Sequence, residues 1–276
     1  MQEGQKKIVV LGGGESGTGS AVLALKMGYE ILLSDSGEIK KNYKDILASK
    51  GINWEENGHS LEAILQANEV IKSPGIPDTT SIIKAIKKVG IPVISEIEFA
   101  ARFTKAKMIC VTGSNGKTTT TNLIWHMMKK AGMNVGMAGN VGHSFAMQVA
   151  ENDFDFYVLE LSSFQLDDIY NFKSDIAILL NITPDHLDRY NYEMKNYVNS
   201  KFKIIQNQNE GDKFIYCSDD QLIIDGLRSR DTTMMKFPFS LEKDPEKAAY
   251  VNNDRIIFKS QNKKFDMSIQ DLALKG

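Results

Sequence analysis

The sequence predicts an α/β fold in which parallel sheets form two successive domains. Short apolar runs alternate with amphipathic stretches, which is the pattern of repeated strand–helix–strand units. Two of the apolar runs lead directly into glycine-rich turns, at residues 12–17 and 113–116. The length of 276 residues suits one large domain or two modest ones. We place the boundary near residue 95, with domains over 1–95 and 96–276.

The first half is predicted to contain three buried strands that alternate with helices. The strands are expected at residues 7–11, 30–34 and 70–72. The helices are expected at about residues 17–27, 40–49 and 60–67. Gly28 follows the first helix, as a helix-ending glycine would. A helix-like stretch at 96–103 leads into the second half.

The second half repeats the alternation and then changes character near its end. Strands are expected at residues 108–112, 156–161, 175–180 and 213–217. Helices are expected at residues 118–131, 141–150 and 190–206. Residues 250–258 and 264–269 predict a β-hairpin, and the sequence ends soon after it without a closing helix. We therefore expect the second domain to be incomplete at its C-terminus.

Composition and charge exclude several classes of protein. The net charge is −2, which provides no field for sequence-independent binding of nucleic acid. The longest apolar runs, such as residues 176–180, are far shorter than the roughly 20 residues of a membrane span. No signal peptide is evident. Cys110 and Cys217 form no metal-binding pair, so we expect two buried thiols in a reducing cytoplasm. We separately expect the protein to be a monomer.

The first glycine turn, Gly12-Gly13-Gly14-Glu15-Ser16-Gly17, satisfies the pattern G-x-G-x-x-G. Glycines let backbone N–H groups approach a diphosphate, and the N-terminus of the following helix favours negative charge. Asp35 ends the next strand, where its carboxylate can accept from a ligand hydroxyl or N–H. The turn predicts a Rossmann-like domain that binds a nucleotide diphosphate. A nicotinamide-dependent dehydrogenase and a turn needed only for helix–strand packing are the alternatives.

The second glycine turn, in Thr112-Gly-Ser-Asn-Gly-Lys-Thr118, carries a more specific signal. Its backbone amides can surround phosphates, Lys117 can reach terminal phosphate oxygens, and the Thr118 hydroxyl can bind Mg²⁺. The common spacing G-x-x-x-x-G-K-[ST] requires glycine at position 111, which is Val111, and Gly113 makes the loop shorter. The context of strand, loop and helix predicts a P-loop ATPase-like central domain.

Polar residues follow two further strands at the expected ligand edge of the sheet. Glu160 ends one strand, and a carboxylate beside a phosphate loop is well placed for Mg²⁺. His186 follows the next strand in an Asp-His-x-Asp sequence, which favours function over a structural role.

Three other polar positions permit two interpretations each. Asn140 either caps the following helix or presents its amide to a ligand. Ser73-Pro74-Gly75 is either a ligand loop or a plain turn. Composition alone makes Lys201 a solvated lysine of a helix.

Taken together, the motifs TGSNGKTTT, ELSSFQL and NITPDHLDRY resemble those of the Mur ligase family. The first glycine turn and the sequence SPGI are also similar to that family. The resemblance implies an ATP-dependent amide-bond ligase of peptidoglycan synthesis, in particular the member that joins D-glutamate to UDP-N-acetylmuramoyl-L-alanine. The substrate carboxylate would first be activated as an acyl phosphate.

The resemblance also implies the roles of individual residues. The uridine diphosphate part of the substrate would contact Ser16, Asp35, Ser36 and Ser73. ATP would contact Gly113, Ser114, Asn115, Gly116, Lys117, Thr118 and Thr119. Two Mg²⁺ ions would have ligands among Thr118, Glu160, His186 and Lys201. The muramoyl-alanine end and the transferred phosphate would contact Asn140, Ser162, Gln165 and His186. The catalytic residues would be Lys117, Glu160, His186 and Lys201.

Two positions need separate comment. Lys201 matches the family's carbamylated lysine, and a neutral amine that adds carbon dioxide becomes an anionic ligand for Mg²⁺. This chemistry requires a lowered lysine pKa, which a metal and Lys117 can supply. Family members can carry an arginine where this chain has Gly37, so a cationic nucleotide contact is expected from another residue, such as Lys40.

The family has a third domain that contributes to D-glutamate binding and closes over ATP, and we expect it to be absent here. On that expectation, the chain binds the UDP-linked substrate, and weakly the ATP phosphates, without turnover. A folylpolyglutamate synthase-type ligase and a non-catalytic nucleotide-binding module are the alternatives.

Overall fold

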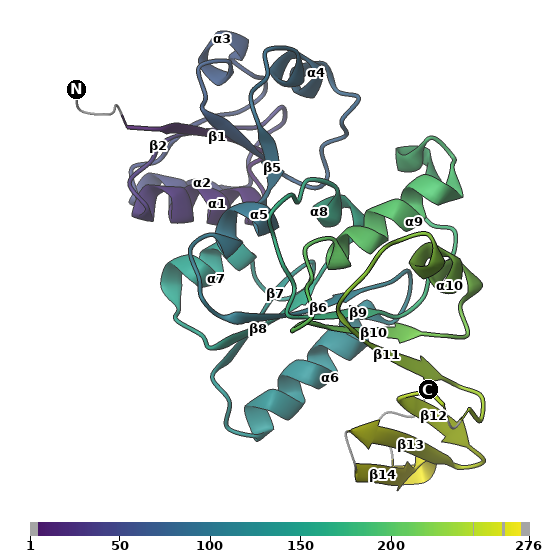
Figure 1. Ribbon diagram of the computed structural model, residues 1–276. Helices are drawn as coiled ribbons and strands as arrows, with labels where there is room; N and C mark the ends of the chain where they lie inside the picture. The colour runs from purple at the N-terminus through teal and green to yellow at the C-terminus, as the bar shows by residue number, and fades with distance from the viewer. Residues whose placement is uncertain (1–4, 245, 261–262, 272–276) are drawn as a thin grey trace. The chain divides into compact units, whose positions relative to one another are not determined.

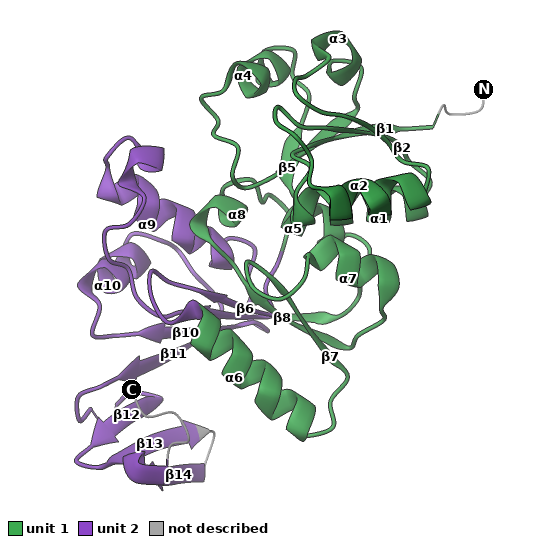
Figure 2. Cartoon of the chain, turned by 180° about the vertical axis from the view of Figure 1, so that it is seen from behind, with its two compact units in different colours: residues 1–108, 118–172 green, residues 109–117, 173–276 purple. Residues whose placement is uncertain are grey.

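A computed structural model describes residues 5–244, 246–260 and 263–271. It divides into two compact units, residues 1–108 with 118–172 and residues 109–117 with 173–276 (Figure 2). Strands and helices alternate along most of the chain, so the predicted α/β class is confirmed (Figure 1). The end of the predicted second domain, residues 272–276, lies outside the described residues.

The first unit contains a five-stranded parallel sheet in the order β3-β2-β1-β4-β5. Its strands are β1 (Lys7–Leu11), β2 (Glu30–Ser34), β3 (Asn53–Glu55), β4 (Glu69–Lys72) and β5 (Val93–Ser95). The three predicted strands are confirmed as β1, β2 and β4. The sequence pattern does not predict β3 or β5, because a run of three residues is too short to show a period.

Helices follow all five of these strands. They are α1 (Glu15–Lys26), α2 (Lys41–Ser49), α3 (Leu61–Ile64), α4 (Ser81–Lys88) and α5 (Glu96–Ala101). The helix predicted at 60–67 is therefore shorter than expected. α4 is not among the predicted elements, although Ile82 and Ile86 have helical spacing. Buried side chains of β1 and β4, including Val9 and Val70, pack with the apolar residues of α3 and α4.

The first unit continues with a second group of elements. They are α6 (Lys117–Lys130), β7 (Val135–Gly139), α7 (Phe145–Glu151), β8 (Phe156–Glu160) and α8 (Ser163–Asp167). β7 and β8 pair in parallel. The helix predicted at 141–150 begins only at Phe145, because Ser144 is its N-cap and accepts from Met147 N. Of the two interpretations of Asn140, the helix cap is therefore wrong, and the amide presented to a ligand stays a prediction.

α7 packs closely on α1 at its first turn. A Cβ atom on Gly19 of α1 would lie 1.9 Å from Ser144 Oγ, so no larger residue fits there without movement. Two carboxylates also contact this turn. Glu15 accepts from Ser144 N at 3.1 Å, and the buried Glu96 accepts from Ser144 Oγ and from Ala146 N. The start of α7 is thus fixed by the first residues of α1 and α5.

In the second unit the strand order is β6-β9-β10-β11-β12-β13-β14. The strands are β6 (Lys107–Thr112), β9 (Ile176–Leu179), β10 (Lys213–Cys217), β11 (Met235–Ser240), β12 (Ala249–Asn252), β13 (Arg255–Ser260) and β14 (Lys263–Ser268). The helices are η1 (Leu187–Tyr190), α9 (Met194–Phe202), η2 (Lys203–Ile205), α10 (Gln221–Arg228) and η3 (Ile269–Asp271). Pairing is parallel from β6 to β12 and antiparallel beyond it.

Two predictions in this unit need correction. The helix predicted at 190–206 is interrupted, because Asn191 and Tyr192 have positive φ values of 57° and 59°. The predicted two-stranded hairpin is a three-stranded antiparallel group, because residues 250–258 turn back on themselves at Asn253. Asn253 has φ 55°, a conformation that asparagine adopts more readily than most residues.

A membrane-spanning helix would need both length and a continuous apolar sequence. In the part of the chain that the structure describes, no helix meets both conditions.

Candidate functional site

The first glycine turn lies between β1 and α1 and is closely surrounded. Gly12 has φ 97°, and a Cβ atom there would lie 2.5 Å from Ser73 Oγ. A Cβ atom on Gly17 would lie 1.8 Å from Gly12 O. Gly14, in contrast, has no heavy atom within 4 Å of its Cβ position. The turn therefore requires glycine for close approach of its own backbone and of the loop after β4.

Asp35 holds this turn in place. Its Oδ2 accepts from Gly13 N at 2.6 Å and its Oδ1 from Gly37 N at 2.8 Å. From its sequence position this carboxylate is expected to accept from a ligand, whereas both of its oxygens already accept from backbone N–H groups. Ser16 lies in the first turn of α1, and Ser36 and Lys40 are exposed near the start of α2.

Ser73 lies at the carboxyl end of β4, beside the glycine turn. Ser73 N donates to Leu11 O at 2.9 Å, so its loop leaves the sheet next to Gly12. Ser73 Oγ is buried and has no hydrogen-bond partner. A buried hydroxyl without a partner at a ligand edge is a candidate for ligand contact.

The second glycine turn forms a short loop between β6 and α6. Gly113 has φ 154°, in the region that glycine alone adopts without strain. Lys117 Nζ lies over the loop and donates to Gly113 O and Ser114 O, each at 2.9 Å. The side chain of the predicted phosphate-binding lysine therefore binds carbonyl groups of its own glycine-rich loop.

Asn181 lies two residues after β9, binds this loop, and is not among the predicted site residues. Its side-chain Oδ1 accepts from Ser114 N at 3.1 Å and from Asn115 N at 2.8 Å, and its Nδ2 donates to Asn115 O. Ser114 Oγ donates to Thr183 O and lies 3.1 Å from the Tyr197 hydroxyl. The sequence feature that indicates a site role for Asn181 is its position just after the strand that pairs with β6.

Lys201 lies in α9, and the structure does not leave it solvated. It is 1% exposed, and its Nζ donates to Gly113 O at 2.8 Å and lies 4.6 Å from the centre of the Tyr197 ring. Burial, and then the neighbouring Lys117 ammonium, lower the pKa of Lys201 to about 7. Near neutral pH the side chain is therefore partly an uncharged amine.

His186 stands at the start of η1 with a left-handed backbone, φ 49° and ψ 35°. Its ring is 60% exposed, and Nε2 lies 3.5 Å from Asp185 Oδ1. The position is open enough for contact with a ligand.

Glu160 ends β8 and is 1% exposed. Its Oε1 accepts from Asn140 Nδ2 at 2.7 Å, and Asn140 N donates to Glu160 O at 2.8 Å. Its Oε2 is buried without a partner. A buried carboxylate oxygen without a donor fits a cation, because burial of a bare charge is costly.

Ser162 and Gln165 are bound to each other at the start of α8. Ser162 Oγ accepts from Gln165 N at 3.3 Å, and Gln165 Oε1 accepts from Ser162 N at 3.0 Å. This reciprocal arrangement is a capping box. Both residues therefore have a structural role besides any contact with substrate.

The residues expected to bind Mg²⁺ divide between the two units. Thr118 and Glu160 belong to the first unit, and His186 and Lys201 belong to the second. Thr118 and Thr119 are exposed in the first turn of α6. Within the described residues, no group of three or more histidine, cysteine, aspartate or glutamate side chains is arranged to hold a metal ion. The four-residue ligand set stays a prediction.

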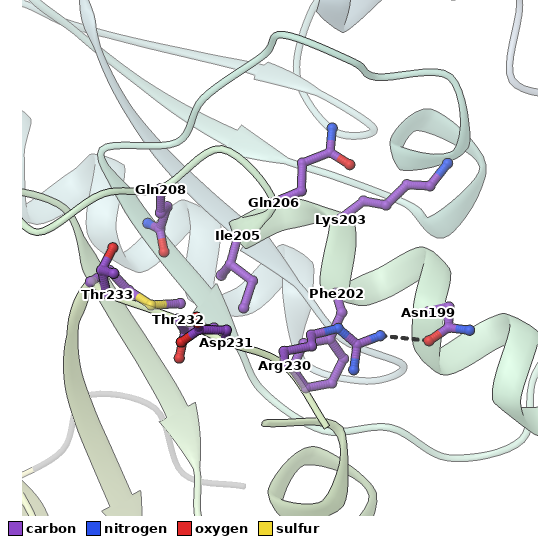
Figure 3. Close-up of a pocket in the computed structure, with 11 residues that line it drawn as sticks. Asn199, Phe202, Lys203, Ile205, Gln206, Gln208, Arg230, Asp231, Thr232 and Thr233 are labelled. Atoms are coloured by element: carbon purple, nitrogen blue, oxygen red, sulfur yellow. Dashed lines mark hydrogen bonds between the residues drawn. The ribbon is translucent and has the colours of Figure 1, made fainter. Parts of the chain in front are cut away.

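Two hollows of the surface lie away from the predicted site residues. In the second unit, a cavity of about 440 Å³ lies where Arg230 packs over the Phe202 ring and binds Asn199 Oδ1 (Figure 3). In the first unit, a hollow of about 460 Å³ is lined by Glu69, Arg102 and residues near them. None of the predicted site residues lines either one.

Comparison with known proteins gives two family matches. Residues 6–95 match the Mur ligase MurD-like N-terminal domain, and residues 111–275 match the Mur ligase middle domain. The UDP-N-acetylmuramoylalanine–D-glutamate ligase of Bacteroides fragilis is 54% identical over 271 residues, which are 98% of this chain and 61% of that protein. The enzyme of the same name from Porphyromonas gingivalis is 47% identical, with 98% and 60% covered. The chain thus spans about three fifths of the length of these relatives.

Solved structures show the same fold at low sequence identity. The UDP-N-acetylmuramate:L-alanyl-γ-D-glutamyl-meso-diaminopimelate ligase of Neisseria meningitidis has a TM-score of 0.64 and 18% identity, over 94% of this chain and 86% of that one. The UDP-N-acetylmuramate–alanine ligase of Thermotoga maritima has a TM-score of 0.55 and 19% identity, over 95% and 60%.

Proposed function

Because the chain belongs to the Mur ligase family, we propose that it serves the ATP-dependent joining of D-glutamate to UDP-N-acetylmuramoyl-L-alanine. The names of the relatives that are 47–54% identical to it support this substrate assignment. In this proposal residues 1–95 bind the UDP-linked substrate and residues 96–276 bind ATP. The expected cytoplasmic location and monomeric state belong to the same proposal.

The observation that carries the proposal is the phosphate loop with its two lysines. Gly113 O accepts from both Lys117 and Lys201, so two basic side chains lie at the loop. Backbone amides of such a loop bind phosphate oxygens, and a lysine at its end reaches the terminal phosphate. We assign ATP to Gly113, Ser114, Asn115, Gly116, Lys117, Thr118 and Thr119.

The reaction proceeds in two steps. A carboxylate oxygen of the substrate alanine attacks the γ-phosphorus of ATP, the bond to the β-phosphate oxygen breaks, and ADP leaves. The amine of D-glutamate then attacks the acyl carbon, loses a proton and expels inorganic phosphate. Lys117 stabilises the charge on the transferring phosphoryl group. His186, Asn140, Ser162 and Gln165 orient the acceptor end.

The donor set suits Mg²⁺, because Glu160 presents a buried oxygen that has no other partner. We propose Thr118, Glu160, His186 and Lys201 as ligands of two ions. When bound, Mg²⁺ neutralises phosphate charge.

Lys201 suits carbamylation. Its amine nitrogen would bond to the carbon of carbon dioxide and release one proton, which yields an anionic carbamate. The lowered pKa supplies the neutral amine that this addition requires. A carbamate signal in ¹³C NMR spectra of the protein with labelled bicarbonate, absent from Lys201→Arg, tests this assignment.

The uridine diphosphate would bind outside the carboxyl ends of β1, β2 and β4. There we assign Ser16, Asp35, Ser36 and Ser73, with Lys40 as a cationic contact. Asp35 would act mainly by holding the glycine turn, since its oxygens bind Gly13 N and Gly37 N.

Binding and turnover test the proposal separately. UDP-N-acetylmuramoyl-L-alanine should raise the melting temperature of the 276-residue chain, because a ligand that binds only the native state stabilises that state. NAD should not raise the melting temperature, because the proposed site takes a UDP-linked substrate. Phosphate release is then measured with this substrate and ATP, with and without D-glutamate. A chain stabilised by NAD alone would overturn the proposal. The prediction that these 276 residues bind without turnover is tested in the same assay.

A further inference from the structure

The ligand edge of the first sheet has its topological switch point between β1 and β4. The strand order β3-β2-β1-β4-β5 means that the chain moves outward from β1 and resumes on its other side at β4. Ligands of open α/β sheets bind at such a point, outside the carboxyl ends of the strands. Leu11 and Lys72 are register partners there, so the glycine turn and the Ser73 loop begin side by side.

Lys72, the last residue of β4, lies beneath that loop. The side chain is 4% exposed. Its Nζ donates to Ile76 O at 3.1 Å and lies 3.1 Å from Asp78 Oδ1, and both atoms belong to the loop of residues 73–78. The same nitrogen lies 2.9 Å from Asp168 Oδ2. The buried Lys72 ammonium group thus binds two residues of the loop, Ile76 and Asp78, and also connects the loop to Asp168.

Asp168 connects Lys72 to the other end of the proposed substrate site. It is the C-cap of α8, is 4% exposed, and its carbonyl accepts from Ser95 N at 2.9 Å. α8 begins at the capping box of Ser162 and Gln165, directly after the strand that ends at Glu160. The five residues of α8, Gln165 among them, therefore connect the partner of Lys72 to Ser162 at the muramoyl-alanine end.

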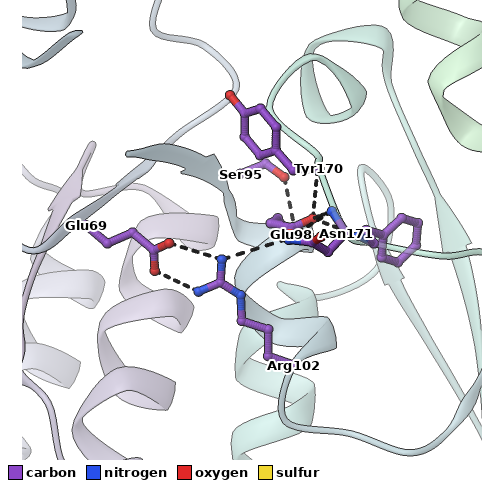
Figure 4. Close-up of polar contacts among 7 residues, drawn as sticks. Glu69, Ser95, Glu98, Arg102, Tyr170 and Asn171 are labelled. Carbon is purple, nitrogen blue, oxygen red and sulfur yellow. Dashed lines mark hydrogen bonds and ion pairs between the residues drawn. The ribbon is translucent and has the colours of Figure 1, made fainter. Parts of the chain in front are cut away.

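A second set of contacts holds the chain just after Asp168. Glu98 is 1% exposed and accepts from the backbone N–H groups of residues 170, 171 and 172 at 2.8–3.0 Å. Arg102 binds Glu69, the first residue of β4, through two hydrogen bonds of 2.7 and 3.0 Å (Figure 4). Both ends of β4 are therefore tied by charged side chains to elements beyond residue 95.

Two ammonium groups, of Lys72 and Lys87, lie beside the two carboxylates of Asp78 and Asp168, so the charges around Lys72 balance. Asp168 is buried and has a raised pKa, which the Lys72 ammonium opposes. The two carboxylates beside Lys72 neutralise its ammonium group, so this group does not attract a diphosphate. Its effect on a ligand must therefore act through the geometry of the loop. A buried ion pair adds little stability, but it can fix one arrangement of the elements that it joins.

We propose that Lys72 is a positioning residue for the UDP-linked substrate. It sets the separation between the diphosphate site at Gly12 and Ser73 and the acceptor site beyond α8. This inference rests on the proposed function, because it requires one ligand that spans both sites. A ligand that occupies only the diphosphate site, such as UDP, depends much less on that separation.

The experiment compares two ligands and four proteins by isothermal titration calorimetry. Lys72→Met/Asp168→Asn removes the ion pair without leaving a buried charge alone. Asp168→Asn weakens the contact between Lys72 and residue 168 by removing the carboxylate charge. This single variant replaces the double variant in the experiment if the double variant does not fold. Lys87→Met is the matched control, because Lys87 also pairs with Asp78 of the loop but is 47% exposed. The ligands are UDP and UDP-N-acetylmuramoyl-L-alanine.

We expect the double variant to bind the whole substrate about tenfold less tightly and UDP within about threefold of the wild type. Asp168→Asn should show a smaller change in the same direction, and Lys87→Met should show none. Equal losses for both ligands, or no loss for either, would overturn the positioning role. If the wild type itself does not bind the whole substrate, the proposed function fails, and the inference fails with it.

Discussion

Lys117 and Lys201 donate to the same oxygen: their side-chain nitrogens lie 2.9 and 2.8 Å from Gly113 O. Lys117 reaches it from the loop that it ends, and Lys201 reaches it from α9. Burial, and then repulsion from the Lys117 ammonium, lower the pKa of Lys201 to about 7, which favours the neutral amine at this carbonyl.

Replacing Lys117 should separate chemistry from substrate binding. In Lys117→Met we expect phosphoryl transfer to fall by at least about a hundredfold, because the ammonium group at the end of the phosphate loop no longer offsets the charge of the transition state. UDP affinity should stay nearly unchanged. Acyl phosphate formation is followed by ADP release, with Lys130→Met at the far end of α6 as the control. Retained acyl phosphate formation in the Lys117 variant would refute the assignment.

Lys201 should make stability depend on pH in the alkaline range. Between pH 7 and 10.5 the unfolded chain binds a proton that the folded chain does not, so the free energy of unfolding rises with pH. Below pH 7 the full cost of burying the cation is present. Lys201→Met removes this cost, so it should stabilise the protein more at pH 6.5 than at pH 9.5. Urea unfolding at both pH values measures it, and equal differences would contradict the lowered pKa.

Glu96 should produce a pH dependence of opposite sign. Burial raises its pKa to about 7, although hydrogen bonds from Ser144 and Ala146 oppose the shift. Between pH 4.5 and 7 the folded chain holds a proton that the unfolded chain has lost, so this group makes the free energy of unfolding fall as pH rises. In Glu96→Gln that fall should disappear. Thermal unfolding from pH 5 to 8 checks it, with the exposed Glu62→Gln expected to behave like the wild type.

The glycine turn offers a matched pair of substitutions. A Cβ atom on Gly17 would lie 1.8 Å from a backbone oxygen, whereas one on Gly14 would meet nothing within 4 Å. We expect Gly17→Ala to destabilise the first unit by about 2 kcal/mol or more and to weaken UDP binding, and Gly14→Ala to cost under about 1 kcal/mol. Chemical denaturation and calorimetry measure the two effects. Similar behaviour of the two variants would mean that the turn can relax.

Ser162→Ala should reveal two roles in one residue. Loss of the capping box should reduce the free energy of unfolding by about 1 kcal/mol. If Ser162 also contacts the substrate, the affinity for UDP-N-acetylmuramoyl-L-alanine falls as well. Ser60→Ala is the control, because Ser60 is an N-cap whose side chain makes no capping hydrogen bond. A loss of stability with unchanged affinity would leave Ser162 with a structural role alone.

The sequence predicts the parts of this fold that depend on local pattern. β1, β2, β10 and the two glycine turns lie where apolar runs and glycine spacing place them. It does not predict β3 or β5, whose three residues show no period, or the turn at Asn253 that splits the final hairpin.

The site residues likewise divide into those that a local sequence motif identifies and those that only the folded structure identifies. Lys117 is identified by its loop, because its neighbours in sequence define the motif. Asn181 and Lys72 act through contacts 66 and 96 positions away, which only the folded chain brings together. Lys201 shows the limit most clearly, since composition alone makes it a surface lysine and only its burial shows otherwise.

The reciprocal hydrogen bonds of Ser162 and Gln165 constrain how this segment can be re-engineered. Each side chain satisfies a backbone N–H of the other residue, so changing one leaves a donor of its companion unmet. A library that varies acceptor specificity should therefore randomise positions 162 and 165 jointly, because a single substitution at either position also lowers stability and so obscures its effect on selectivity.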